Sequence, residues 1–422
     1  MHFDDAVSRT NVTKLLSVAS AIAVPLVLFF ALSVSARAQT LTLLFGFPDR
    51  GQCFRNPTPN GGLILDAQGN LYGTTQCSGK HNQGSIFELT PSGAETTLFN
   101  FYHPVGRYPM AGLVRDSSGN LYGTTYNGGL KGEGVVFELT PTGTEAVLHS
   151  FVAPSTTRGK KPPDGGGPEA SLTLDGQGNL YGTTSYGGNG NAPVCGPESG
   201  CGTVFELTPS GTETLLYQFT GESDGAIPVA PVVFDSQGNL YGTTQYGGTP
   251  GFGVVFKLNP SGVETVLYSF TGGADGSFPN GGLVLDKKGN VYGVTLEGGG
   301  TKNLDCQAGC GIVFKVSPTG EETILHSFTD APDGSYPVGS LVFDSHGNLY
   351  GATTSGGVVG GGTIFKITAS GKETVLYSFT GKADGGGPTG SLAIDSQGNL
   401  YGTTSYGGIE SVQGGVAFKL TP

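Results

Sequence analysis

Five aspartates occupy the same position of a repeated sequence and are the first candidates for chemistry. Each precedes a glycine and lies four residues before a proline; they are Asp164, Asp224, Asp275, Asp333 and Asp384. A ring of carboxylates of this kind could bind cations or the hydroxyl groups of sugars. The alternative, which we favour, is a turn in which the aspartate accepts bonds from the next amides along the chain and the glycine adopts a positive φ. The sequence contains no Asp-x-Asp-x-Asp-Gly calcium loop.

The first two repeats depart from this pattern and carry basic side chains instead. Arg55 and Val105 stand where the other repeats have aspartate, and Arg115 replaces an apolar residue. The residues that we single out as a subsite for an anion or a sugar acid are Arg55, His81, His103, Arg107 and Arg115. The alternative is drift in the first repeats. Three Tyr-Gly-Gly segments add rings that could stack on sugars, at Tyr186, Tyr246 and Tyr406.

Six cysteines form an even set, which indicates disulfides in an exported chain. Their Cys-x5-Cys and Cys-x3-Cys spacings are poor for zinc, and the six histidines do not cluster with them. The expected pairs are Cys53–Cys77, Cys195–Cys201 and Cys306–Cys310. The sequence therefore predicts neither a metal site nor a cofactor.

The composition excludes several classes of protein. The 422 residues include 75 glycines and 25 prolines, which would break helices repeatedly, so a coiled coil or a helical bundle is excluded. The net charge of −12 argues against nucleic-acid binding, which requires a basic surface. The sequence lacks Gly-x-Ser-x-Gly, His-Glu-x-x-His and phosphate-loop motifs. This lowers the expectation of an enzyme without excluding one, because a site can also be assembled from distant residues.

We interpret the N-terminus as an export signal. Arg9 and Lys14 precede an apolar stretch at 15–34, and Ala36-Arg37-Ala38 is a suitable cleavage site. Cleavage after Ala38 would leave residues 39–422 as the mature chain, with no membrane span, and 1–38 as the signal peptide. The alternative is a retained membrane anchor, because about 20 apolar residues can cross a bilayer.

An internal repeat predicts the elements that must position these residues. The string Asp-x-x-Gly-Asn-[Leu/Val]-Tyr-Gly occurs seven times at intervals of 50 to 60 residues, and a proline precedes each Asp by seven residues. Each period holds four short runs rich in β-branched and aromatic residues, separated by turn signals. Four antiparallel strands per period make one propeller blade. We therefore predict an all-β, seven-bladed β-propeller over residues 39–422.

The two ends of the chain are predicted to share a blade. The seventh period stops at Pro422 before a fourth strand, whereas a copy of the fourth-strand sequence precedes the first period, at about residues 41–47. We predict that this N-terminal strand completes blade 7 and closes the ring, which removes two unpaired strand edges. The loops between second and third strands share one face with the connections between blades, so the candidate residues should gather at the channel mouth on that face.

The repeat resembles a known family. Gly-Asn-Leu-Tyr-Gly-Thr-Thr, Tyr-Gly-Gly, Val-Phe-[Glu/Lys]-Leu-x-Pro and Glu-Thr-Val-Leu-Tyr-Ser-Phe are similar to the GloVer tandem repeat of Gloeobacter and Verrucomicrobia, over residues 40–422. The resemblance implies an exported bacterial protein, often surface-anchored, and no established activity, so it supplies no catalytic residues. The Asp-x-x-Gly-Asn-[Leu/Val]-Tyr run is also similar, more loosely, to NHL-type β-propellers.

These observations favour an exported, non-catalytic binding or interaction module, because the repeated motifs are structural and the variable loops share one face. The expected partner is an extracellular glycan or a cell-surface protein. We expect a monomer that is secreted, periplasmic or on the cell surface. Two alternatives stay open. One is a propeller enzyme, a lyase or hydrolase acting on a polysaccharide or lactone at the channel mouth; the other is a purely structural envelope protein.

Overall fold

The structure is a computed structural model that describes residues 39–48, 59–152, 164–190, 192–196, 199–300, 302–408 and 413–422. The predicted signal peptide, Cys53 and Arg55 lie outside the described residues. Residues Ala38–Pro422 form one compact unit. Within the described part of the chain, no helix is long and apolar enough to cross a membrane.

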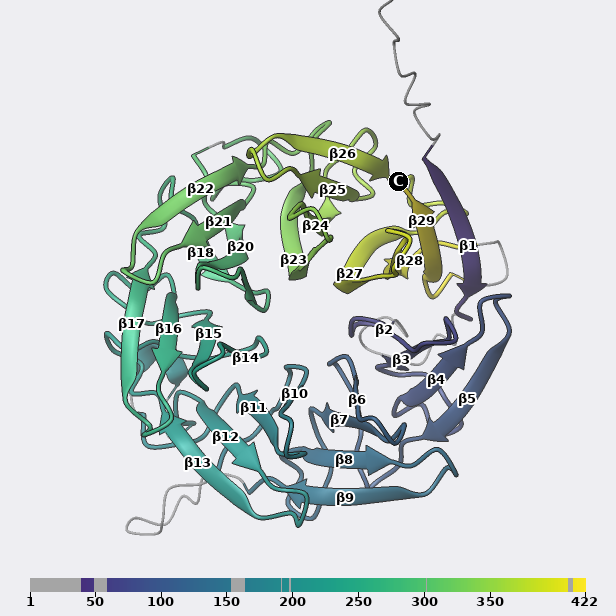
Figure 1. The fold of residues 1–422 in the computed structure, drawn as a ribbon, viewed down its shortest axis with the longest axis vertical. Helices are drawn as coiled ribbons and strands as arrows, with labels where there is room; N and C mark the ends of the chain where they lie inside the picture. The colour runs from purple at the N-terminus through teal and green to yellow at the C-terminus, as the bar shows by residue number, and fades with distance from the viewer. Residues whose placement is uncertain are drawn as a thin grey trace, which may run out of the picture. The chain divides into compact units, whose positions relative to one another are not determined.

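Short strands joined by tight turns form seven antiparallel sheets, which are arranged in a ring as the blades of a propeller (Figure 1). This confirms the predicted all-β, seven-bladed fold. Blade 1 holds β2 (Ile64–Leu65), β3 (Leu71–Thr75), β4 (Ser85–Leu89) and β5 (Glu95–Asn100). Blade 2 holds β6 (Val114–Arg115), β7 (Leu121–Thr125), β8 (Val135–Leu139) and β9 (Glu145–Ser150). Blade 3 holds β10 (Thr173–Leu174), β11 (Leu180–Thr184), β12 (Thr203–Leu207) and β13 (Glu213–Gln218), with a 3-10 turn η1 (Pro193–Cys195) in its second loop.

The other four blades follow the same order. Blade 4 holds β14 (Val233–Phe234), β15 (Leu240–Thr244), β16 (Val254–Leu258) and β17 (Glu264–Ser269). Blade 5 holds β18 (Ser277–Pro279), β19 (Val284–Leu285), β20 (Val291–Glu297), β21 (Ile312–Val316) and β22 (Glu322–Ser327). Blade 6 holds β23 (Ser335–Phe343), β24 (Leu349–Ser355), β25 (Thr363–Ile367) and β26 (Glu373–Ser378). Blade 7 holds β27 (Gly386–Ile394), β28 (Leu400–Tyr406), β29 (Val416–Thr421) and β1 (Thr40–Gly46).

The N-terminal strand closes the ring, as predicted. β1 pairs antiparallel with β29, from Thr40 opposite Thr421 to Gly46 opposite Val416. Figure 1 shows β1 and β29 side by side in this blade. The outermost strand of blade 7 therefore comes from the start of the propeller and its three inner strands from the end, so opening the ring requires breaking this ladder.

Phenylalanines join each blade to the next. One follows the outermost strand of a blade and packs against another in the third strand of its neighbour. Phe219 meets Phe256 with ring centroids 5.2 Å apart, and both side chains are fully buried. The pair Phe47–Phe87, at 5.1 Å, repeats the contact where blade 7 meets blade 1. Such aromatic pairs contribute roughly 0.5–1.5 kcal/mol each beyond the apolar area that they bury.

The glycine of each Leu-Tyr-Gly or Val-Tyr-Gly segment makes room for the phenylalanine of the third strand. A Cβ atom on Gly242 would lie 2.6 Å from Cζ of Phe256. The repeat therefore keeps glycine beside tyrosine because the ring occupies the space that a side chain would need.

The first turn of each blade is held by its aspartate. Asp235 Oδ1 accepts hydrogen bonds from the backbone N–H groups of Gln237 and Asn239, and Oδ2 accepts from the Asn239 amide (2.7 Å) and the Tyr241 hydroxyl (3.0 Å). Burial raises the pKa of Asp235, but these hydrogen bonds outweigh it and hold the pKa below its ordinary value. The repeated tyrosine hydroxyl is thus bonded within its own blade.

The propeller has two unlike faces. The connection face carries the loops between second and third strands and the connections between blades, and the turn face carries the Asp-x-x-Gly-Asn turns. Two predicted disulfides, Cys195–Cys201 and Cys306–Cys310, lie in such loops of the connection face. Cys77 is buried in a third loop, and its predicted partner Cys53 lies outside the described residues.

Candidate functional site

A central cavity of about 270 Å³ lies where the innermost strands begin, toward the connection face. Its lining comes from all seven blades and, apart from Thr354, is drawn in each blade from the three residues that follow the fixed proline. The second and third of these positions hold only glycine, alanine, serine or proline. Most of the wall is therefore backbone and short side chains. The residue at the first position mainly determines which chemical groups the cavity presents to a ligand.

The first residue after the proline differs between blades. We call these seven residues the mouth ring: Asn60, Met110, Glu169, Val229, Asn280, Val338 and Thr389. The ring combines one carboxylate, two amides, one hydroxyl and three apolar side chains. None of these seven residues was predicted from the sequence as part of a site. The sequence nevertheless contains a signal for them: the residue directly after the fixed proline varies widely between the seven periods.

The wall beneath the mouth ring is held by contacts within and between blades. Within blade 1, the Asn60 amide donates to Gln76 Oε1 at 2.6 Å. Between blades 7 and 1, the Thr389 hydroxyl donates to the Pro59 carbonyl oxygen at 2.7 Å. A Cβ atom on Gly390 would lie 2.6 Å from the backbone nitrogen of Gly62 in the next blade. The backbones of neighbouring blades thus touch around the cavity, which fixes its shape before a ligand arrives.

The predicted basic subsite is divided between the two faces. Arg107 pairs with Asn127, beyond the last residue of β7, whereas Arg115 pairs with Leu121, its first residue. Six residues of extended chain span about 20 Å. This corrects the expectation that Arg115 lies at the mouth: it ends the innermost strand and lies toward the turn face. None of the described basic candidates lines the central cavity.

The remaining basic candidates gather between blades 1 and 2 on the connection face. The His81 ring lies against Tyr102, with centroids 5.8 Å apart, and His103 follows in the same connection and is exposed. The Arg107 guanidinium carbon lies 5.6 Å from the centroid of the Tyr108 ring. Its Nε is buried and finds no partner within the described part of the chain. Arg55 lies outside the described residues.

The three candidate tyrosines differ in exposure. The Tyr186 hydroxyl donates to Glu133 Oε2 at 2.7 Å, and burial together with this glutamate raises the pKa of Tyr186. Tyr246 packs against Phe278 with centroids 5.1 Å apart and is only partly exposed. Tyr406, at 38% exposure, is the most accessible of the three. Two of the three rings are thus already engaged by the protein.

The five aspartates lie between the outermost strands of adjacent blades, away from the central cavity. Asp224 accepts hydrogen bonds from the Tyr217 hydroxyl, the Thr220 N–H and the Thr220 hydroxyl. These donors precede the aspartate, whereas the sequence predicted amides that follow it. Gly225, next in sequence, has the expected positive φ of +104°. The carboxylates therefore accept hydrogen bonds from nearby residues of their own blade, and each lies at one interface between blades.

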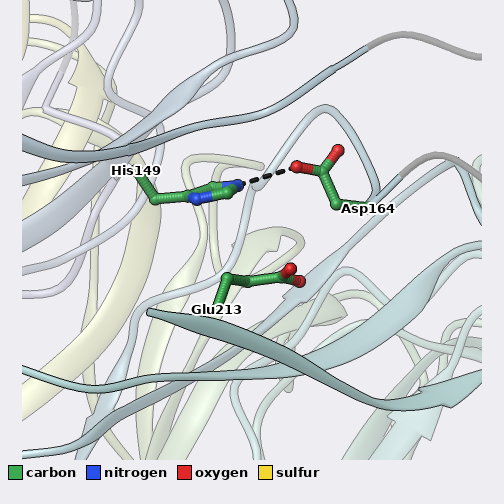
Figure 2. A group of neighbouring side chains, drawn as sticks. All are labelled: His149, Asp164 and Glu213. Carbon is green, nitrogen blue, oxygen red and sulfur yellow. Dashed lines mark hydrogen bonds and ion pairs between the residues drawn. The ribbon is translucent and has the colours of Figure 1, made fainter. Parts of the chain in front are cut away.

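At two of these interfaces a histidine takes the place of the tyrosine. Figure 2 shows His149 pointing toward Asp164, with Nε2 and Oδ2 2.9 Å apart, and Glu213 of the next blade beside them. His326, Asp333 and Glu373 repeat the arrangement, with His326 Nε2 at 3.1 Å from both carboxylate oxygens. In each group the nitrogen and the two carboxylate oxygens lie within 4.8 Å of one another.

The glutamates at the start of the outermost strands lie in an environment that disfavours the charged carboxylate. Burial raises the pKa of Glu145, Glu264 and Glu322 to about 7. Burial also raises the pKa of Glu213 to about 7, with His149 lowering it and Asp164 raising it. Glu373 has a raised pKa for the same reason. In all five, Oε1 is buried and has no hydrogen-bond partner among the described residues.

The Gloeobacter/Verrucomicrobia repeat matches this chain three times, over residues 30–194, 155–306 and 300–422. The chain belongs to the Gloeobacter/Verrucomicrobia repeat family. No curated protein matches the sequence.

Among solved structures, this member of the repeat family is similar to virginiamycin B lyase from Staphylococcus aureus, crystallised as a catalytically inactive variant with quinupristin. The TM-score is 0.56 at 14% identity, over 91% of this chain and 99% of the lyase chain. It is also similar to the extracellular domain of a hybrid two-component system protein from B. thetaiotaomicron, with a TM-score of 0.53 at 11% identity. That match covers 89% of this chain and 39% of the other. At these identities the likeness shows the propeller fold alone.

Proposed function

We propose that this protein is an exported, non-catalytic binding module that takes the end of an extracellular glycan into its central cavity. One observation carries the proposal: the mouth ring is the part of the cavity where the side-chain chemistry changes most from blade to blade. A sugar has no sevenfold symmetry, so a site that recognises one must break the symmetry of the ring.

The size and chemistry of the cavity support a glycan end. Ligand pockets usually measure about 300–1,000 Å³, so a cavity of about 270 Å³ suits a terminal sugar more than a length of polymer. Asn60, Asn280 and Thr389 offer amide and hydroxyl groups to sugar hydroxyls. Glu169 is the only titratable side chain among the described lining residues, which favours a neutral or amino sugar over a sugar acid.

The same lining supports binding without catalysis. Glycoside hydrolysis commonly needs two carboxyl groups about 5–9.5 Å apart, and acyl transfer needs a nucleophile beside a base. The described lining residues include one carboxylate, and they include no histidine, cysteine or lysine. Glu169 can orient a ligand, and the described lining residues include no second titratable group that could share proton transfer with it.

Export is part of the proposal. The predicted signal peptide and the disulfides Cys195–Cys201 and Cys306–Cys310 fit an oxidising compartment outside the cytoplasm. The glycan would then be met at the cell surface or in the medium, at the connection face.

The test is a thermal-shift screen of the purified protein against neutral sugars, amino sugars and sugar acids. A ligand at 100 times its Kd stabilises the folded state by about 2.7 kcal/mol, which raises Tm measurably. We expect a neutral or amino sugar to raise Tm, Glu169→Leu to reduce the shift, and Arg115→Leu, on the turn face, to preserve it. A shift only with sugar acids, or mass-spectrometric detection of a reaction product, would contradict the proposal.

A further inference from the structure

The interfaces between outermost strands offer a second kind of site. Three positions recur there: the aromatic residue near the end of one outermost strand, the aspartate in the connection that follows it, and the glutamate that begins the next outermost strand. Between blades 3 and 4 these are Tyr217, Asp224 and Glu264. Between blades 2 and 3, and between blades 5 and 6, histidine replaces the tyrosine.

We propose that each of the two histidine-containing interfaces binds one divalent transition-metal ion, with zinc as the reference ion. The ligands are His149, Asp164 and Glu213 in the first site, and His326, Asp333 and Glu373 in the second. The proposal is independent of the glycan site, because it concerns the rim of the propeller and not its central cavity. It departs from the sequence analysis, which predicted no metal.

The donor set decides the class of ion. One imidazole nitrogen and two carboxylate oxygens suit zinc and neighbouring transition metals, whereas calcium and magnesium prefer oxygen ligands alone. Tetrahedral zinc places its ligand atoms about 3.4 Å apart, given metal–ligand distances of about 2.0–2.2 Å. The donors now lie within 4.8 Å of one another, and His149 Nε2 and Asp164 Oδ2 lie 2.9 Å apart. Zinc would therefore replace the hydrogen bond between His149 and Asp164, with these two atoms moving slightly apart and Glu213 moving toward them.

The protein already orients the aspartate of each site. Asp164 Oδ1 accepts from the Val152 N–H at 2.9 Å, which leaves Oδ2 directed at His149. In the second site, Asp333 Oδ2 accepts from the N–H and the hydroxyl of Thr329. Such outer contacts fix the orientation of metal ligands.

The third ligand lacks a partner. Oε1 of Glu213 and Oε1 of Glu373 are buried without a hydrogen bond to any described residue. A buried carboxylate oxygen in this state costs free energy, and a cation beside it would remove that cost. The His149 and Asp164 side chains are each 17% exposed, which leaves an ion a path to the site and allows a water to complete its coordination.

The other interfaces provide controls within the same chain. Tyr217, Asp224 and Glu264 keep both carboxyl groups but present a phenol, which donates to the aspartate. Between blades 1 and 2, Phe99 and Val105 leave Glu145 without either partner. Histidine is therefore the residue that turns a repeated structural interface into a metal site.

The decisive experiment is equilibrium dialysis of the purified protein against zinc, with the bound metal counted by mass spectrometry. We expect two zinc ions per chain in the wild type, one in His149→Tyr and none in the double variant His149→Tyr/His326→Tyr. The tyrosines restore the sequence of the other interfaces, so these variants should fold. His103→Ala, which changes an exposed histidine elsewhere, should still bind two.

A variant that creates a third metal site provides a second test. Tyr217→His gives the interface between blades 3 and 4 the same three ligands, so we expect a third zinc ion. We also expect zinc to raise Tm of the wild type, since each ion joins two blades, and to leave Tm of the double variant unchanged. Two ions retained by the double variant, or no third ion in a folded Tyr217→His protein, would overturn the proposal.

Discussion

At the residue scale, the repeat places carboxyl groups in two opposite environments. Asp235 lies in a turn that donates four hydrogen bonds to it, and its pKa is lowered. Glu264 lies between outermost strands with a buried oxygen that has no partner among the described residues, and its pKa is raised to about 7. The charged form is favoured in the first place and disfavoured in the second, so the two groups affect stability in opposite directions as the pH changes.

The turn aspartate is predicted to stabilise the protein above acidic pH. Asp235→Asn removes an acceptor for the Asn239 amide and the Tyr241 hydroxyl, so we expect the free energy of unfolding at pH 7 to fall by about 1–3 kcal/mol. Because the folded pKa is lowered, this contribution is present above the unfolded pKa of about 3.8 and is lost as the pH falls through the folded pKa. Urea denaturation at pH 7 and pH 3 measures both effects. An equal loss at the two pH values would refute the charge argument.

The glutamate between strands is predicted to act in the opposite sense. With a folded pKa near 7 against an ordinary value of 4.5, Glu264 favours the folded state below about pH 4.5, and this contribution is lost as the pH rises through 7. Glu264→Gln should therefore raise Tm at pH 8 and change it little at pH 4.5. Glu321→Gln, at an exposed position just before the outermost strand of blade 5, serves as the control and should show no such dependence. A Tm gain of equal size at both pH values would show that charge burial is not the cause.

At the element scale, most of the architecture could be predicted because one period specifies one blade. The Asp-x-x-Gly-Asn turn, the Pro-x-Gly turn and the strand pattern all recur, and the displaced copy of the fourth strand predicted the pairing of β1 with β29. The extra strand β18 of blade 5 was not predicted, because it pairs only at Ser277 and Pro279, outside the repeated runs.

The candidate sites were less predictable because they join residues of different blades. His149 and Glu213 are neighbours only because two outermost strands lie side by side, and no local spacing reveals this. Aligning the seven periods would have shown histidine at the tyrosine position. The mouth ring is also visible only when the residues after the seven prolines are compared with one another.

The closing strand is predicted to contribute as much as an ordinary blade contact. Phe47 is buried at 4% exposure and meets Phe87 as Phe219 meets Phe256. We expect Phe47→Ala and Phe219→Ala each to lower the free energy of unfolding by about 3–5 kcal/mol. Chemical denaturation provides the measurement, with Leu130→Ala, at an 84% exposed position, as the control. A Phe47→Ala protein as stable as the wild type would mean that the ring does not depend on β1.

At the scale of the whole molecule, seven similar blades enclose one cavity that is not symmetric. The rim carries two histidine-containing interfaces, and the centre carries the mouth ring. Export, metal binding at the rim and ligand binding at the centre are separate proposals that can fail separately. The central claim is that a glycan end enters the cavity, and it predicts that filling the cavity abolishes binding.

The most direct test is isothermal titration of the best sugar from the thermal-shift screen against the wild type and Val229→Trp. Val229 belongs to the mouth ring, so an indole at this position would occupy the space proposed for the ligand. The expected result is at least a tenfold increase in Kd for Val229→Trp, with an unchanged Kd for Arg115→Leu on the turn face. An unchanged Kd in a folded Val229→Trp protein would place the ligand elsewhere and contradict the central claim.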